Sequence, residues 1–303
     1  MASIGLRVTR ALFGLTEHVA PRLAGRAAFE LFCRTPSPKS QTAGEKRAIA
    51  RARTFMDEAR HHFVGTENGC VVVHEFRPES RRPALGAVLV IHGWRSRTEY
   101  MRALIQGYRD AGYRVLSLDL PGHGRSPGRR LTMVNAVAAA RAAGDWFGPF
   151  AAVVGHSFGG AVAVNAFVGS VAGIPPLAAE RLVLIAAPNA MSEIFAGFGR
   201  FVNLGARSFA AMAGRVERIA GRPLAEFVSS DQLARASVPT LVIHAPDDRE
   251  VSAADASMLA GAGDHVRLSW APGLGHRRIL SDPTVVAEAV GFLAERQEHA
   301  LVH

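Results

Sequence analysis

The sequence predicts an α/β protein in which a doubly wound, mostly parallel sheet is flanked by helices. Short apolar runs alternate with helical patterns along residues 61–303. Such alternation is typical of parallel sheets, because parallel strands need a crossover connection that is usually a helix. Several runs are continuously apolar, as in strands that are buried on both faces. The chain has 303 residues, 49% of them hydrophobic, which is enough to bury such a sheet.

The expected elements follow from these patterns. β-branched and aliphatic residues dominate each strand run. The predicted strands cover 70–76, 87–91, 115–118, 150–154, 182–185, 241–243 and 266–270. The predicted helices cover 98–111, 131–145, 160–166 and 284–295.

One segment interrupts the alternation. About fifty residues between Ile185 and Val238 contain no strand pattern, which is too long for a plain connection. Phenylalanines and methionines recur in it among glycines and arginines, and we predict a helical cap over about 188–236. Its Phe195 and Phe198 are expected to contact substrate, because large apolar side chains line apolar pockets. An ordinary packed helical insertion is the alternative.

Residues 1–60 are predicted to form a basic, helical N-terminal arm ahead of the body. They hold 11 Lys/Arg and 5 Asp/Glu, which accounts for +6 of the net charge of +9. Thr35-Pro36-Ser37-Pro38 ends any helix. No apolar run reaches the ~18 residues of a membrane span. A secretory signal is not expected either, because no apolar core precedes a small-residue cleavage site.

The arm carries an apolar stripe at helical spacing, with arginines between its members. Two interpretations remain open: peripheral contact with an anionic membrane surface, or docking on the main domain with the arginines solvated. We favour docking, since such stripes usually meet protein. The stripe consists of Ile4, Val8, Leu12, Leu15 and Val19.

Composition excludes several classes. The chain has no nucleic-acid motif and no basic-aromatic alternation, so no nucleic-acid partner is expected. Its two cysteines, Cys33 and Cys70, lack metal-type spacing, so neither a disulfide framework nor a zinc site is predicted. We expect no metal and no cofactor. Reduced thiols suit a cytoplasmic location, either free or peripheral to the inner face of the membrane.

The strongest functional signal is Gly155-His156-Ser157-Phe158-Gly159. It fits Gly-x-Ser-x-Gly and lies between a predicted strand and a small-residue helical pattern, the context this motif requires. Glycines allow such a strained turn without a Cβ clash. The turn would hold the Ser157 hydroxyl at the C-terminal edge of the sheet as a nucleophile. A structural serine in a glycine-rich turn is the alternative.

A serine nucleophile needs a base and an orienting acid. His276 follows Gly273-Leu274-Gly275 after the last strand, at the same sheet edge, and is the predicted base. Asp248 is favoured as the acid over Asp247, which would instead pair with Arg249 or cap the next helix. Other histidines are assigned elsewhere. His156 is expected to pack into the turn, His123 to shape the pocket, and His61, His62 and His299 to lie on the surface.

A tetrahedral intermediate also needs preorganised donors for its oxyanion. The backbone amide of Phe158 directly follows the nucleophile. Trp94 follows His92-Gly93 after the strand at 87–91 and is predicted to supply the second amide.

Five short motifs occur in a fixed order over residues 92–276. They are His92-Gly93, Asp119-x-Pro121-Gly122-His123-Gly124-x-Ser126, Gly155-His156-Ser157-Phe158-Gly159-Gly160, Asp248-x-x-Val251 and Gly275-His276. In these motifs the chain resembles the α/β-hydrolase superfamily, and most closely its serine-aminopeptidase-like and monoglyceride-lipase-like branch. It departs from the pattern at Ala245, usually glycine, and Ser252, often proline. The serine at 157 argues against haloalkane dehalogenase or epoxide hydrolase chemistry, for which the resemblance would require aspartate.

The resemblance implies a serine esterase, lipase or thioesterase. We expect hydrolysis of a small-molecule carboxylic ester with an apolar portion, through an acyl-enzyme on Ser157. An acyltransferase, a thioesterase or a peptidase would use the same triad, and a non-catalytic ligand-binding protein could share the fold. Oligomeric state is not predicted. Substrate contacts are expected at His92, Gly93, His123, His156, Phe195 and Phe198.

Overall fold

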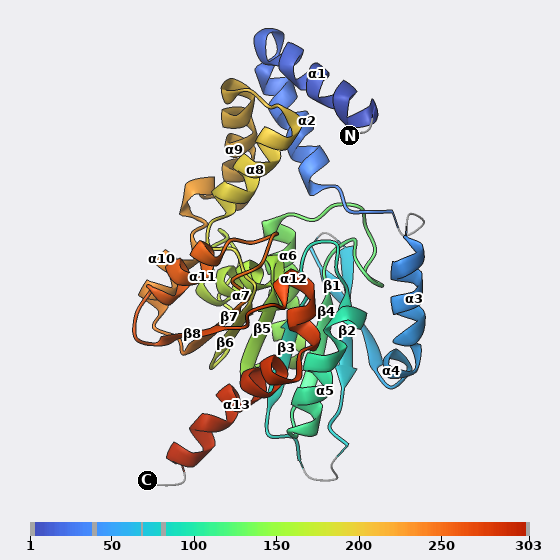
Figure 1. Cartoon of the computed structure of the whole chain (residues 1–303), viewed down its shortest axis with the longest axis vertical. Coiled ribbons are helices and arrows are strands. Elements are labelled where there is room, and N and C mark those ends of the chain that lie inside the picture. Colours follow the sequence, from blue (N-terminus) through green and yellow to red (C-terminus); the bar gives the residue numbers. More distant parts are fainter. Residues whose placement is uncertain (1–3, 38–40, 68, 80–82, 301–303) are drawn as a thin grey trace.

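A computed structural model describes residues 4–37, 41–67, 69–79 and 83–300, and the side chains up to residue 295. Eight strands form one sheet in the order β1-β2-β4-β3-β5-β6-β7-β8 (Figure 1). Strands β3 to β8 run parallel, while β2 pairs antiparallel with β4 and β1 with β2. The predicted doubly wound, mostly parallel sheet is confirmed. The strands are β1 (Arg60–Thr66), β2 (Gly69–Phe76), β3 (Ala87–Ile91), β4 (Arg114–Asp119), β5 (Ala152–His156), β6 (Leu182–Ile185), β7 (Thr240–His244) and β8 (Val266–Trp270).

Strand β1 was not predicted, because its polar and aromatic residues lack an apolar run. Edge strands tolerate such composition. Its His61 and His62 lie on this edge strand and are half-buried, so their predicted surface position holds only in part. His61 Nδ1 lies 2.8 Å from His74 Nδ1, and His62 Nε2 lies 2.8 Å from Glu75 Oε2. The side chain of His299 lies outside the described part of the structure.

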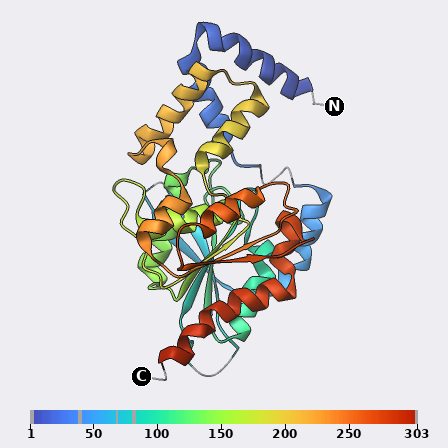
Figure 2. The same cartoon turned by 60° about the vertical axis from the view of Figure 1, so that its left-hand side comes forward.

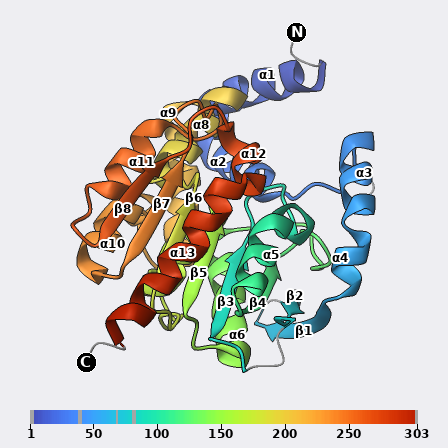
Figure 3. The ribbon, with the colours of Figure 1, turned by 60° about the horizontal axis from the view of Figure 1, so that its bottom comes forward.

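Helices cover both faces of the sheet, as Figure 3 shows from below. The face that includes Val88 and Val90 packs against α5 and α13, and the face that includes Leu89 and Ile91 packs against α6 and α7. This alternation follows from the two-residue period of a strand. These helices are α5 (Arg102–Asp110), α6 (Met133–Phe147), α7 (Phe158–Val168) and α13 (Pro283–Ala300). The smaller helices are α3 (Ala43–Arg51), α4 (Arg53–Asp57), η2 (Thr98–Met101), α10 (Ser229–Ala236), α11 (Ala253–Ala260), α12 (Gly275–Arg278) and η4 (Ile279–Ser281).

A separate helical layer stands over the sheet (Figures 1 and 2). Two of its helices, α8 (Met191–Val202) and α9 (Ala206–Ala220), come from the insertion, followed by the short η3 (Leu224–Glu226). The other two, α1 (Ile4–Val19) and α2 (Pro21–Cys33), come from the N-terminal arm. The insertion is therefore helical, as predicted, and the arm completes it.

The arm docks on the insertion through two close contacts. Gly25 of α2 lies so near α9 that a Cβ there would fall 2.3 Å from the Ser208 carbonyl oxygen. The Glu17 carboxylate of α1 accepts hydrogen bonds from the amides of Arg207 and Ser208, 2.9 and 3.0 Å away, at the start of α9. A hydrogen bond from the Ser208 hydroxyl, together with these two amide bonds, lowers the pKa of Glu17. A carboxylate at a helix N-terminus satisfies free amides and favours the helix dipole.

The apolar stripe of α1 takes no part in this docking. Phe13 is the buried residue of α1, and it points to the opposite side. The five stripe residues Ile4, Val8, Leu12, Leu15 and Val19 are between 53% and 87% exposed. The arm thus meets protein, but not through the pattern on which the docking interpretation was based. No helix of the described chain is both long and apolar enough to cross a bilayer.

Candidate active site

Ser157 occupies a strained turn between β5 and α7. Its φ of 53° and ψ of −125° lie where residues other than glycine are rarely found. The turn is also tight. A Cβ on Gly155 would fall 2.3 Å from the Gly159 carbonyl oxygen, and one on Gly159 would fall 2.2 Å from that of Ile91. These contacts explain the glycines of the motif and leave the serine side chain facing a cavity.

His276 and Asp248 form a hydrogen-bonded pair at the same edge of the sheet. His276 Nδ1 lies 2.7 Å from Asp248 Oδ2, and the second oxygen of Asp248 accepts from the amides of Glu250 and Val251. Burial favours the neutral carboxyl, but the hydrogen bonds from the ring and the two amides outweigh it and lower the pKa of Asp248. An ionised Asp248 holds the proton of His276 on Nδ1, which leaves Nε2 able to accept one.

The neighbouring Asp247 has a different place. Its Oδ1 accepts from the amide of Gly273, 2.8 Å away, and so ties two loops together. The following helix α11 is capped by Ser252 instead. Of the two aspartates, the structure brings only Asp248 to His276.

His156 contacts the segment that carries His276. Its Nε2 lies 2.9 Å from the backbone oxygen of His276, and the two rings lie 4.8 Å apart between centroids. Ser157 and His276 line one cavity, but within the described residues no hydrogen bond joins Oγ to Nε2. Glu250 was not anticipated by the sequence; its Oε2 lies 3.9 Å from His276 Nε2, and Arg277 pairs with its other oxygen.

Two backbone amides lie beside Ser157. Phe158 is the first residue of α7, where an amide has no partner within its own helix. Trp94 follows β3, and in the described part of the chain neither its amide nor that of Phe158 donates a hydrogen bond. Gly93 sets the spacing, because a Cβ there would fall 2.9 Å from that of Ser157. Trp94 and Phe158 therefore lie beside Ser157, and within the described residues their amides remain free to donate.

Four of the predicted substrate contacts do not line the cavity; three of them are histidines that bond to backbone. His92 Nε2 accepts from the Leu120 amide at 3.0 Å, and His123 Nε2 accepts from the Arg95 amide at 3.1 Å. Burial lowers the pKa of His92, that of His123 to about 4 and that of His156 to about 3. The rings are neutral supports of the loops around the site. Gly93, the fourth, provides space beside the elbow.

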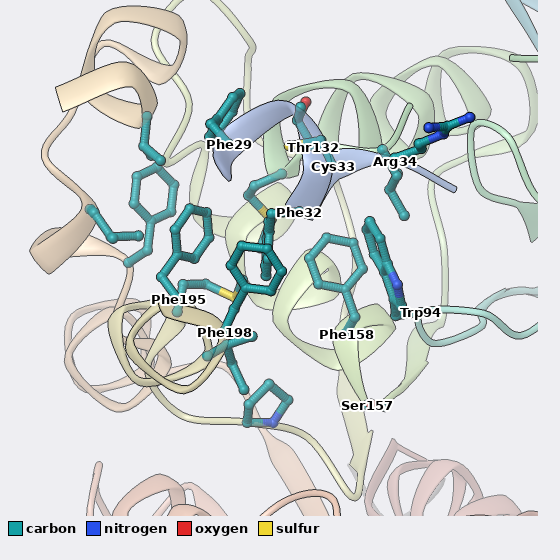
Figure 4. Close-up of a pocket in the computed structure, with 18 of the residues that line it drawn as sticks. Phe29, Phe32, Cys33, Arg34, Trp94, Thr132, Ser157, Phe158, Phe195 and Phe198 are labelled. Carbon is teal, nitrogen blue, oxygen red and sulfur yellow. The ribbon is translucent and has the colours of Figure 1, made fainter. Parts of the chain in front are cut away.

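The cavity beside Ser157 has a volume of about 450 Å³ and a mostly apolar wall (Figure 4). Phe195 and Phe198 line it, as predicted. The wall also includes residues of α2 that the sequence did not reveal, because nothing local in the arm shows that it folds back over the insertion. The apolar lining includes Phe29, Leu31, Phe32, Trp94, Phe158, Met191, Ile194, Phe195, Phe198, Phe201, Leu224 and Phe227.

Phe32 links the arm to the centre of the cavity. Its ring lies 4.3 Å from Phe195, 5.2 Å from Phe198 and 6.0 Å from Trp94, between centroids. Such aromatic contacts stabilise beyond the area that they bury. One wall of the cavity therefore depends on the arm. Among the described residues, no group of three His, Cys, Asp or Glu side chains could hold a metal ion.

Comparison with known families assigns this fold and site to a class. A family model described as the alpha/beta hydrolase family matches residues 88–289, and the chain belongs to this family. The match spans β3 to α13, and so includes the elbow, Asp248 and His276. No protein of curated function matches the chain significantly.

Solved structures of the same fold share little sequence with it. An esterase domain from Rhodothermus marinus is 21% identical, with a TM-score of 0.54, over 78% of this chain and 96% of that one. Est1E from Butyrivibrio proteoclasticus, with ferulic acid bound, is 16% identical, with a TM-score of 0.58, over 80% and 100%. A membrane phospholipase A, a bacterial virulence factor, is 17% identical, with a TM-score of 0.57, over 82% and 91%.

Proposed function

We propose that the protein is a serine hydrolase that cleaves carboxylic esters with an apolar acyl or alcohol portion. The observation that carries the proposal is the 2.7 Å pair between His276 Nδ1 and Asp248 Oδ2, beside a cavity that Ser157 shares. Membership of the alpha/beta hydrolase family supports hydrolase chemistry.

In the first half-reaction His276 Nε2 takes the proton of Ser157 Oγ as the oxygen attacks the ester carbonyl carbon. The alcohol oxygen then leaves with that proton, and the acyl group stays on Ser157. Asp248 keeps the ring oriented and stabilises the imidazolium. Catalytic hydrogen bonds often tighten only with substrate bound, and this step requires His276 Nε2 to come within hydrogen-bond reach of Ser157 Oγ.

In the second half-reaction water gives a proton to His276 Nε2 and attacks the acyl carbon; the bond to Ser157 Oγ then breaks, His276 returns the proton to Oγ, and the acid is released. Both tetrahedral intermediates carry a negative oxygen, which the free amides of Trp94 and Phe158 would stabilise. Each such donor contributes about 3 kcal/mol of transition-state stabilisation.

The cavity supports an apolar substrate. Its volume of about 450 Å³ falls in the usual range for ligand sites, and its wall is mainly phenylalanine and aliphatic side chains. Similar structures include an esterase domain, a ferulic acid complex and a phospholipase A, all names that point to esters or their acid products.

The test is hydrolysis of p-nitrophenyl esters of increasing acyl length by the purified chain and by Ser157→Ala. We expect hydrolysis by the former and none by the latter, with unchanged folding by circular dichroism. A fluorophosphonate probe should label Ser157, as shown by peptide mapping. Ser257→Ala on the exposed face of α11 is the matched control and should keep full activity. Turnover by Ser157→Ala would refute the mechanism.

A further inference from the structure

The exposed face of α1 is an apolar surface with no protein partner in the described chain. At about 100° per residue, its five stripe residues fall within about 80° of the helix circumference. Residues of the docked face, such as Phe13 and Glu17, lie on the other side of the helix. A contiguous exposed apolar patch of this kind marks an interaction surface. As above, the stripe is Ile4, Val8, Leu12, Leu15 and Val19.

Exposed arginines occur on both α1 and α2; by helical position Arg7 borders the stripe, whereas Arg10 lies on the docked side with Phe13 and Glu17. Arg7, Arg10, Arg22 and Arg26 are exposed, and none forms an ion pair within the described residues. The acidic residues of these two helices are Glu17 and Glu30, and both are paired, with Arg207 and Arg130. The exposed surface of α1 and α2 thus combines apolar side chains with a net positive charge. This charge complements an anionic surface.

The apolar surface continues towards the cavity. Leu23, Ala27 and Leu31 recur every fourth residue on α2, and all three are exposed. Leu31 also lines the cavity, as does Phe201 of α8, which is 57% exposed. Phe201 lies close to α1, because Asn203 contacts the backbone oxygen of Arg10. Exposed apolar residues of α2 and α8 therefore reach the cavity that holds Ser157.

We propose that α1 binds along the surface of an anionic lipid bilayer, with its stripe among the acyl chains and the arginines that border the apolar faces of α1 and α2, Arg7 and Arg26, at the headgroups. Amphipathic helices with basic polar faces bind membranes in this way. A second copy of the chain is a poorer partner, since a two-fold contact through the same face would bring like-charged arginines together. An ester held in the bilayer would then reach Ser157 along α2, a step that rests on the proposed function.

The binding test uses the full chain and flotation with vesicles. We expect binding to equimolar phosphatidylglycerol and phosphatidylcholine, weak binding to phosphatidylcholine alone, and weaker binding as salt screens the charges. The double variant Leu12→Glu, Leu15→Glu should bind the anionic vesicles at least about tenfold less. Trp146→Glu, which places an acid on an exposed aromatic position of α6 (66% exposed), is the matched control and should bind normally.

The charge contribution is tested separately. Arg7→Gln with Arg26→Gln should weaken binding to anionic vesicles about tenfold or more, because each basic residue near such a surface contributes a factor of about five. Arg53→Gln with Arg60→Gln removes two exposed arginines elsewhere and should leave binding unchanged. Equal binding by all these variants would overturn the proposal, as would absence of binding by the natural chain.

Two further measurements separate the outcomes. Leu12→Glu, Leu15→Glu should hydrolyse a short soluble ester at the natural rate but lose activity on an ester carried in anionic vesicles. If the natural chain cleaves soluble esters but does not bind vesicles, the membrane proposal fails and the proposed function stands. Sedimentation velocity without lipid should show a monomer; a dimer that the α1 variant dissociates, together with no vesicle binding, would identify a second copy as the partner.

Discussion

His156 Nε2 lies 2.9 Å from the backbone oxygen of His276, so the residue before the predicted nucleophile holds the segment that carries the predicted base. The contact joins two turns 120 residues apart in the sequence. Because Nε2 donates this bond, His156 Nδ1 is an acceptor, and among the described residues this buried atom has no hydrogen-bond partner. The ring cannot take a second proton there at low cost, which agrees with its pKa of about 3.

The first prediction concerns stability against pH. In the unfolded chain His156 takes up a proton below about pH 6.5, whereas in the native state it does so only near pH 3. The free energy of unfolding should therefore fall as the pH drops from about 6.5 towards 3. The contribution is about 1.4 kcal/mol per pH unit. His156→Gln keeps a donor without titrating and should reduce the slope by about this amount in urea denaturation at pH 7, 6 and 5. If His156→Gln left the pH dependence of the free energy of unfolding unchanged, His156 would have to be protonated in the native state as well.

The second prediction separates the two neighbouring aspartates. Asp248→Asn should lower kcat on p-nitrophenyl esters by about 10³–10⁴, because an amide would favour the wrong tautomer of His276. Asp247→Asn is the matched control, since it keeps an acceptor for the Gly273 amide, and it should change kcat by less than about tenfold. A larger loss in Asp247→Asn would reassign the acid.

The third prediction concerns the space beside the elbow. Gly93→Ala would place a Cβ 2.9 Å from that of Ser157 and 3.2 Å from His156 Nδ1, so the elbow and the Trp94 amide must shift. We expect kcat to fall by about 10²–10³, comparable with loss of one oxyanion donor. Gly214→Ala in α9 is the control, because its Cβ would meet no atom within 4 Å, and the melting temperature should hold or rise. Full activity in Gly93→Ala would remove this loop from the mechanism.

The fourth prediction concerns chain length. Phe32→Ala removes an aromatic side chain that contacts Phe195 and Phe198 in the cavity. We expect kcat/KM to fall about 10- to 100-fold for an octanoate ester, the loss of about 1.5–3 kcal/mol of apolar contact. The acetate ester should change little. Phe63→Ala at a 71% exposed position of β1 should leave the acyl-length profile as it is; a uniform loss over all lengths in Phe32→Ala would indicate a disturbed elbow instead.

The sequence predicted the parallel sheet because each buried strand is a continuous apolar run between turn residues. It also predicted the positions at which Ser157, Asp248 and His276 gather, since all three follow strands whose carboxyl ends share one edge. The strand β1 was not predicted, because an edge strand needs no apolar run. The orientation of side chains was not predicted either. His92 and His123 lie in the expected loops, but they turn towards backbone groups and not towards the cavity.

The arm shows the limit of periodicity most clearly. A stripe of five apolar residues predicted a helix, and α1 is one. The same stripe could not say which face packs, because docking depends on Glu17 and Phe13 meeting partners some 190 residues later in the chain. Local patterns carry no information on contacts of such sequence separation. The role of α2 in the cavity wall was missed for the same reason.

The cavity beside Ser157 is walled by both the N-terminal arm and the insertion, and this has a consequence for biosynthesis. Helix α2 leaves the ribosome before α8 and α9, on which it rests, because about 160 residues of chain lie between α2 and α8. Until then Phe29 and Phe32 have no place to pack, and the nascent N-terminus exposes them to chaperones and to other chains. A fusion partner joined ahead of α1 would act at this same stage, so its effect on yield should exceed its effect on the finished enzyme.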